Sequence, residues 1–149
     1  MRRMILRLFC LALCLTLLPL PAMAEEATAA PAIRVLLRRL NLTDRADLIL
    51  DGVYSVETAS GTAMAFPRGS QLTVQVRNGS LYLFYQGMSL DGGAGLRLTR
   101  SENAEHTGLR FEKGGNLYPG DLALTVEGGL LQPVLTISVE DYLLGVVPY

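Results

Sequence analysis

Apolar and polar residues alternate along most of this 149-residue chain. The clearest alternation covers residues 71–77, where Leu72, Val74 and Val76 would share one face of an extended strand. The same pattern predicts further strands at 33–37, 47–51, 53–57, 81–85, 96–99, 108–111, 122–127 and 134–139. Strands at intervals of roughly ten residues, separated by turns, indicate a mainly β fold. We therefore expect a compact antiparallel β structure of the barrel or sandwich kind.

Glycine-containing turn sequences separate several of these strands. Asn78-Gly79 predicts a tight hairpin, because a type I′ turn needs positive φ at both central residues. Gly128-Gly129 precedes Leu130-Leu131 and predicts a second hairpin. We also expect Asp91-Gly92-Gly93 to form a turn, and Gly52 to join or bend the two strands beside it.

A helix is indicated at residues 140–147, where the β structure is expected to end. The apolar residues there recur at the spacing of one helix face: Tyr142, Leu143, Val146 and Val147. Glu140 and Asp141 would favour the positive end of that helix. Side chains of adjacent residues diverge, so these two cannot flank one glycosidic bond as a catalytic pair.

The first 24 residues have the features of a cleaved secretory signal. Arg2, Arg3 and Arg7 form a basic start, residues 8–20 are apolar, and Ala22-Met23-Ala24 is a small-x-small cleavage site. The apolar stretch is shorter than the ~20 residues that span a bilayer. A lipoprotein signal is the alternative, since Cys10 and Cys14 lie here, but large residues precede both cysteines.

Removal of the signal changes the chemistry that remains. Both cysteines are lost, so the mature chain can form no disulfide and no thiolate site. Three of the 13 Lys and Arg are lost as well, which leaves ten against 14 Asp and Glu, a net charge of −4. This acidic balance argues against nucleic acid as a partner. Residues 25–32 read as a linker, and residues 33–149 as one domain-sized segment.

The mature sequence assembles no convincing catalytic or metal site. His106 is the one histidine and lies in a polar turn, where a solvated side chain is the ordinary interpretation. One histidine among carboxylates lacks the spacing of a metal site, and no cofactor is expected. Tyr82, Phe84 and Tyr85 could stack on sugars. Tyr82 and Phe84 share one strand face and Tyr85 the other, so core packing is favoured.

The segment 139–148, Val-Glu-Asp-Tyr-Leu-Leu-Gly-Val-Val-Pro, resembles the hallmark stretch of the SpoIID/LytB family of bacterial cell-wall proteins. Weaker similarities are the opening strand at 33–36, Gly52-Val53-Tyr54, the Asn78-Gly79 hairpin and the step from Tyr118 to Leu122. The resemblance implies that these residues flank an active site: Glu140, Tyr142, Gly145, Val146, Val147, Pro148 and Tyr149.

In family members that are lytic transglycosylases, Val-Val-Pro and one variable residue precede the catalytic glutamate. That acid protonates the glycosidic oxygen and then takes the proton of the C6 hydroxyl, which closes a 1,6-anhydro ring. Tyr149 occupies the variable position here. We therefore expect residues 33–149 to be the amino-terminal portion of a larger α+β domain, truncated before its glutamate and inactive as given, with no catalytic residue of its own.

The resemblance implies an exported protein, outside the cytoplasm and associated with the cell wall or membrane, that acts on peptidoglycan glycan strands, with a role in sporulation. The alternative is a non-catalytic module that binds the wall and enhances an autolytic murein amidase, as some relatives do. A third hypothesis is an unrelated small secreted β domain.

Overall fold

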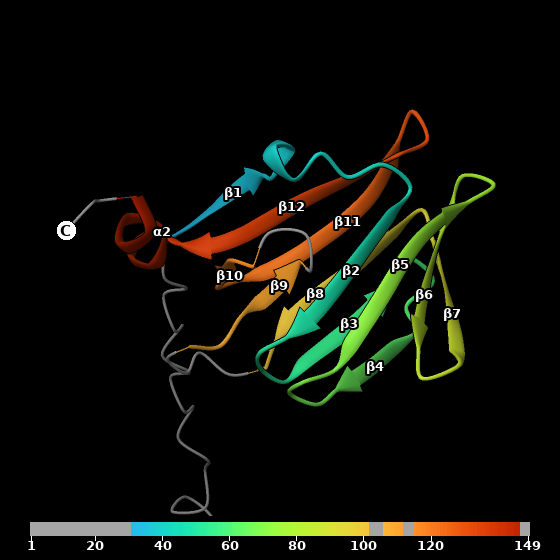
Figure 1. Cartoon of the computed structure of the whole chain (residues 1–149), viewed down its shortest axis with the longest axis horizontal. Coiled ribbons are helices and arrows are strands. Elements are labelled where there is room, and N and C mark those ends of the chain that lie inside the picture. The colour runs from blue at the N-terminus through green and yellow to red at the C-terminus, as the bar shows by residue number, and fades with distance from the viewer. Residues whose placement is uncertain (1–30, 102–105, 112–114, 147–149) are drawn as a thin grey trace, which may run out of the picture.

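The computed structural model describes residues 31–101, 106–111 and 115–146. Within these ranges twelve strands form two six-stranded antiparallel sheets that face one another, followed by one short helix (Figure 1). The predicted mainly β, antiparallel fold is confirmed. Of the two forms expected, the chain adopts the sandwich-like one, because the two sheets stay separate and do not close into a barrel.

The strand order within each sheet differs from the order along the chain. The first sheet runs β1 (Ala32–Leu36), β12 (Leu130–Ser138), β11 (Asp121–Glu127), β8 (Gly95–Arg100), β3 (Tyr54–Thr58), β4 (Ala63–Phe66). The second runs β10 (Leu117–Tyr118), β9 (Leu109–Phe111), β2 (Arg45–Leu50), β5 (Gln71–Arg77), β6 (Ser80–Tyr85), β7 (Met88–Gly93). A 3-10 turn, η1 (Arg38–Leu40), follows β1, and the helix is α2 (Val139–Val146).

The core lies between the sheets and is built from the alternate residues that the sequence pattern selects. Leu72 and Val74 of β5 are buried, whereas Gln71, the first residue of the same strand, is exposed. The largest fully buried side chains come from both sheets: Tyr54, Phe66, Phe111, Leu48, Leu50, Leu72, Leu81, Leu83, Leu98, Leu109, Leu122 and Leu124. Burial of this apolar surface is the main favourable term in the stability of the fold.

Two predicted hairpins are confirmed. Asn78 and Gly79 have φ values of 51° and 80° and join β5 to β6. Gly128 and Gly129 have φ values of 59° and 81° and join β11 to β12. Positive φ at both central residues is what a type I′ turn requires, and asparagine and glycine adopt it at low cost.

The predicted turn at Asp91-Gly92-Gly93 is wrong, because these residues belong to β7. The pairing of β6 with β7 skips Gly92, so the three residues form an irregularity within the strand. Asp91 Oδ1 accepts a 2.9 Å hydrogen bond from the Gly93 N–H. A Cβ on Gly92 would lie 2.6 Å from Leu96 Cδ2. Aspartate and glycine therefore serve here to bend a strand and to let it pack closely.

The sequence predicts separate strands at 130–131 and 134–139, but one continuous strand, β12 (Leu130–Ser138), runs through Pro133, and Val139 begins α2. The pairing of β1 with β12 extends to Val134, the residue that follows the proline. Beyond that point the Pro133 carbonyl accepts a 2.9 Å hydrogen bond from Leu37 N–H. Proline has no backbone N–H to donate. At Pro133 this missing donor lies just outside the hydrogen-bonded pairing of β1 with β12, where a strand tolerates it.

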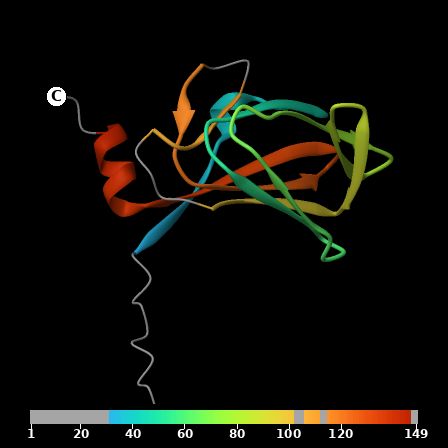
Figure 2. The ribbon, with the colours of Figure 1, turned by 90° about the horizontal axis from the view of Figure 1, so that it is seen from below.

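The link between β2 and β3 carries the chain from one sheet to the other (Figure 2). Gly52 lies at the crossing, as the sequence suggested, and a Cβ there would come within 3.2 Å of Thr107 Cβ. The crossing is held against the segment before β9 by two backbone bonds, Asp51 N–H to Gly108 O at 2.8 Å and Ser101 N–H to Val53 O at 2.9 Å. In the described ranges we find no helix with enough apolar residues to span a bilayer.

Candidate binding cleft

A cleft of about 680 Å³ opens between α2 and one end of the sandwich. Figures 1 and 2 show α2 at this end, beyond β1, β12 and β10. Apolar side chains form most of the lining: Val35, Leu37, Leu117, Pro119, Leu135, Ile137 and Leu144. The other lining residues are Arg100, His106, Thr107, Tyr118, Asp141, Tyr142 and Gly145. A largely apolar cleft of this size with a few polar groups has the character of a small-ligand site.

The helix beside the cleft begins with a side-chain cap. The Asp141 N–H donates a 3.0 Å hydrogen bond to Ser138 Oγ, which satisfies one of the free donors of the first turn. Glu140 and Asp141 both lie in that turn, where their charges favour the positive end of the helix. Val139 N–H is bonded at 3.1 Å to the Pro31 carbonyl just before β1. The predicted helix is thus confirmed, beginning one residue earlier than expected.

The helix directs only some of its hallmark residues toward the cleft. Asp141, Tyr142 and Gly145 line it, whereas Glu140 is exposed and does not. Leu143 is also outside the lining and is 50% exposed, whereas Tyr142 lines the cleft and is 38% exposed. The Val146 side chain and residues 147–149, which include Val147, Pro148 and Tyr149, lie outside the described part.

The step from Tyr118 to Leu122 has a defined structural role at the cleft. Tyr118 lines the cleft and packs edge-on against Phe111, with ring centroids 5.5 Å apart. Leu122 is fully buried. Asp121 Oδ1 accepts a 2.9 Å hydrogen bond from the Arg100 backbone N–H, which ties the end of β8 to the start of β11.

Arg100 is the charged residue most deeply placed in the cleft. Its side chain is 11% exposed, and its Nη2 lies 3.9 Å from Asp141 Oδ2, too far for a hydrogen bond. Nη1 donates a long 3.4 Å bond to the Thr107 carbonyl. Its Nε is buried and has no hydrogen-bond partner among the described residues, an arrangement that costs about 1–3 kcal/mol. The sequence pattern gave no signal for Arg100, since its burial depends on how the two sheets end.

The hydroxyl of Tyr54 lies behind the same end of β8. Burial raises the pKa of this phenol, while the nearby Arg100 guanidinium acts in the opposite direction and only partly offsets the effect. Tyr54 therefore stays protonated and donates its hydrogen to the Gly120 carbonyl at 2.9 Å. The bond fixes the backbone at Gly120, immediately before β11. The cleft residues Tyr118 and Pro119 directly precede this glycine.

The other sequence candidates lie at the rim or elsewhere. His106 is exposed with a φ of 59°, which agrees with a solvated turn histidine, although it borders the cleft. Among the described residues, no group of three or more His, Cys, Asp or Glu side chains is arranged to hold a metal ion. Of the aromatic group in β6, Tyr85 packs against Phe66, with ring centroids 5.1 Å apart, as core packing predicted.

The prediction of core packing is wrong for Tyr82 and Phe84. Both are partly exposed and lie on the outer face of their sheet, because Leu81 and Leu83 take the inner positions of β6. The Arg77 guanidinium covers the Phe84 ring at 4.8 Å from its centroid. Cation–π packing of this kind gives a surface aromatic residue a structural partner.

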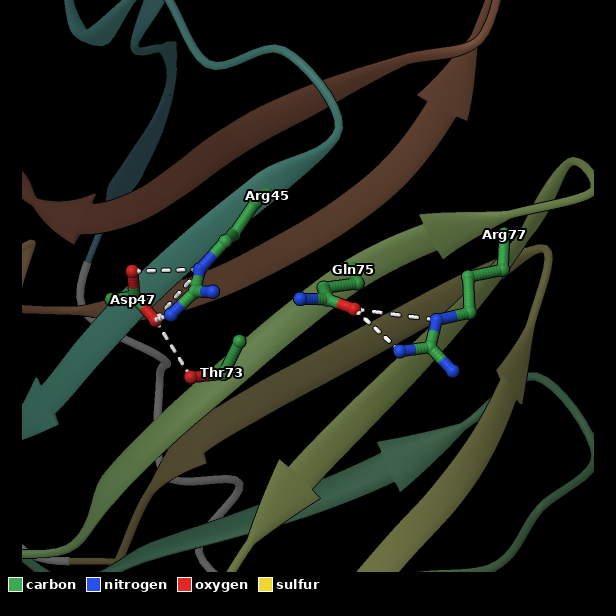
Figure 3. A network of polar contacts seen from close by, with 5 residues as sticks. All are labelled: Arg45, Asp47, Thr73, Gln75 and Arg77. Carbon is green, nitrogen blue, oxygen red and sulfur yellow. Dashed lines mark hydrogen bonds and ion pairs between the residues drawn. The ribbon is translucent and has the colours of Figure 1, made fainter.

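Polar contacts cross the same outer face, as Figure 3 shows. Asp47 on β2 accepts hydrogen bonds from Arg45 Nη2 at 2.7 Å and from Thr73 Oγ1 at 2.6 Å. The hydrogen bond from Arg45 is the main reason that the pKa of Asp47 is lowered, against a smaller effect of burial. Gln75 accepts a 2.9 Å bond from Arg77. The bond from Thr73 to Asp47 ties β2 to β5, and none of these five residues lines the cleft.

Comparisons with protein-family models, with curated proteins and with solved structures give no match for this chain. The resemblance to the SpoIID/LytB family thus remains a prediction from the residues. The function has to be argued from the cleft and from the segments that meet there.

Proposed function

We propose that this chain serves in an exported bacterial cell-wall protein and binds the glycan strands of peptidoglycan in the cleft beside α2. One observation carries the proposal: segments that resemble the SpoIID/LytB family, although far apart in the sequence, converge on this cleft. They contribute Val35, Tyr118 and the helix residues Asp141, Tyr142 and Gly145 to its lining.

The cleft suits a sugar chain chemically. Tyr118 and Tyr142 offer flat apolar rings with a hydroxyl at the edge, a combination that contacts both faces and hydroxyls of a sugar. The volume of about 680 Å³ lies within the range of small-ligand sites. The apolar walls exclude water from the ligand, which strengthens each polar contact made inside.

The activity that the resemblance implies is that of a peptidoglycan lytic transglycosylase. Of the two adjacent carboxylates, only Asp141 faces the cleft, so they do not form a pair across one bond. The catalytic acid would be the glutamate that the resemblance places after Tyr149. Residues 25–149 alone are therefore expected to bind the wall without cutting it.

Sedimentation with purified murein sacculi tests the binding. Every buried core side chain of the described part lies between Ala46 and Ile137, so a chain of residues 25–149 keeps this core. We expect Tyr142→Ala to weaken binding about fivefold or more, since an interface aromatic residue is lost. Leu143→Ala is the matched control, because Leu143 is the next residue of α2 but lies outside the cleft.

Three results would count against the proposal. Binding of the unchanged chain that does not exceed that of an inert protein would remove the wall as its ligand. Equal loss of binding in both variants would remove the cleft as the site. Release of anhydro-muropeptides by residues 25–149 would overturn the assignment of the acid to a later residue.

The alternative role, enhancement of a murein amidase, is favoured by a separate observation. Leu143 presents an apolar side chain that is 50% exposed on the face of α2 outside the cleft, where a protein partner could cover it. Under this role Leu143→Ala lowers stimulation of the amidase and leaves sacculus binding unchanged. The codon that follows Tyr149 in the source genome also separates the roles: glutamate favours the enzyme, and any other residue favours the enhancer.

A further inference from the structure

The Arg100 side chain is largely buried, and the polar contacts that it makes are long. Its side chain is 11% exposed and lines the cleft, yet its shortest side-chain contact is the 3.4 Å bond to the Thr107 carbonyl. The carboxylate of Asp141 is 3.9 Å away and 38% exposed. A guanidinium presents five donors in a planar fork that matches a carboxylate. Most of that capacity is unused among the described residues.

A cation that is largely removed from water is stabilised by an anion placed beside it. The rest of the lining points to the kind of anion. Most of the wall is apolar, which fits an organic body better than a small hydrated ion. Asp141 at the same site would repel a multiply charged ligand but would accept hydrogen bonds from hydroxyl or amide groups.

We propose that the cleft selects ligands that carry a single carboxylate on an organic body, and that Arg100 is the residue that binds this carboxylate. This inference rests on the proposed function, because that function is the reason for choosing the sugars of peptidoglycan as probes. In peptidoglycan the two alternating sugars differ in this respect: N-acetylmuramic acid bears a lactyl group, whose carboxylate is free once the stem peptide has been removed, and N-acetylglucosamine bears none. Arg100 is thereby assigned as a specificity-determining residue of the cleft.

The test compares the two free sugars as ligands of residues 25–149, by titration followed through backbone amide NMR signals. N-acetylmuramic acid is expected to bind about tenfold more tightly than N-acetylglucosamine, the preference that a charge-assisted contact supplies. Arg100→Gln is expected to abolish this preference. Arg97→Gln is the matched control, since Arg97 lies on the same strand, is exposed and is outside the cleft.

Arg100→Lys provides a second variant if Arg100→Gln does not fold, because it keeps the charge while losing the planar fork. It is expected to reduce the preference and not to abolish it. Equal affinity for the two sugars, or no binding of either, would overturn the inference. So would a preference that persists in Arg100→Gln. Sacculus binding that continues in those cases would leave the proposed function standing, so the two failures are distinguishable.

Discussion

The hydroxyl of Tyr54 on β3 donates a 2.9 Å hydrogen bond to the carbonyl of Gly120, 66 residues later in the chain. The bond joins the fully buried first residue of β3 to the backbone that leads into β11. It therefore connects the core to the segment that carries Tyr118 into the cleft. Substitutions of Tyr54 and of Gly120 test the two ends of this connection.

Tyr54→Phe removes the donor and leaves the ring in place. We expect the free energy of unfolding to fall by about 1 kcal/mol, with the Gly120 carbonyl left without this partner. Urea denaturation measures the change, with Tyr82→Phe as the control, since Tyr82 is partly exposed on the outer face. A Tyr54→Phe chain as stable as the unchanged protein would show that water replaces the hydroxyl.

The raised pKa of Tyr54 adds a pH dependence to the same variant. An unfolded chain ionises this phenol near the ordinary value of 10.0, whereas the folded chain holds the proton to higher pH. The contribution is therefore complete below pH 10 and is lost as the pH rises through the folded value. The stability gap between the unchanged protein and Tyr54→Phe is expected to shrink in strongly alkaline urea titrations.

Gly120→Ala tests the close approach of the same backbone to β12. Gly120 has a φ of 148°, and a Cβ there would lie 2.3 Å from the Thr136 carbonyl oxygen. Overpacking of this kind costs about 1–3 kcal/mol, in addition to the strain of the backbone conformation. Gly61→Ala is the matched control, because Gly61 also has positive φ, at 84°, but has open space around it.

Thermal unfolding of Gly120→Ala and Gly61→Ala separates the cost of overpacking from the cost of the backbone conformation. If the backbone conformation were the whole cost, Gly120→Ala and Gly61→Ala would lower the melting temperature equally. We expect a clearly larger drop for Gly120→Ala, since only there does the added methyl group meet backbone atoms. Backbone atoms of two paired strands cannot move aside as a flexible side chain can.

Ser138→Ala tests the cap that sets the start of α2. Loss of the Ser138 Oγ acceptor leaves the Asp141 N–H without its 3.0 Å bond, at a cost of about 1 kcal/mol to the helix. The effect should be local, because the buried core lies in the strands. Hydrogen exchange is expected to speed up at the amides of α2 and not in β5. Uniform acceleration across both elements would indicate that the cap supports the whole domain.

The sequence predicts strands and hairpins well here for a physical reason. Alternation in 71–77 and positive φ at Asn78-Gly79 are local requirements, and the structure meets both. The same glycine signal failed at Asp91-Gly92-Gly93, because a strand irregularity and a turn both use residues with unusual backbone freedom. The strand β4 was missed, since an edge strand with three exposed residues out of four shows little alternation.

The candidate site likewise has parts that the sequence predicts and parts that it does not. The helix and its acidic start could be predicted, because their signals lie within a few residues; the Ser138-x-x-Asp141 spacing was available and would have indicated the cap. Arg100 and the meeting of Val35, Tyr118 and Tyr142 could not be predicted. Their proximity follows from the strand order, in which β1 neighbours β12 across almost the whole length of the chain.

The contacts of Asp47 predict a pH dependence of opposite sign to that of Tyr54. Arg45 lowers the pKa of Asp47 from its ordinary value of 3.8. Asp47 therefore stabilises the fold above about pH 4, and this contribution is lost as the pH falls through the lowered value. Arg45 and Asp47 side chains are 54% and 26% exposed, so water screens the pair. We expect Asp47→Asn to cost at most about 1 kcal/mol at neutral pH.

Urea denaturation of Asp47→Asn at pH 7 and at pH 2.5 tests this sign. The deficit relative to the unchanged protein should be largest at pH 7 and should shrink toward pH 2.5, because the contribution of Asp47 is lost as the pH falls toward and through its lowered pKa. Asp44→Asn is the control, because Asp44 is exposed and its side chain accepts a 3.1 Å bond from neighbouring Thr43, which asparagine can also accept. A deficit that is the same at both pH values would assign the role of Asp47 to its shape and not to its charge.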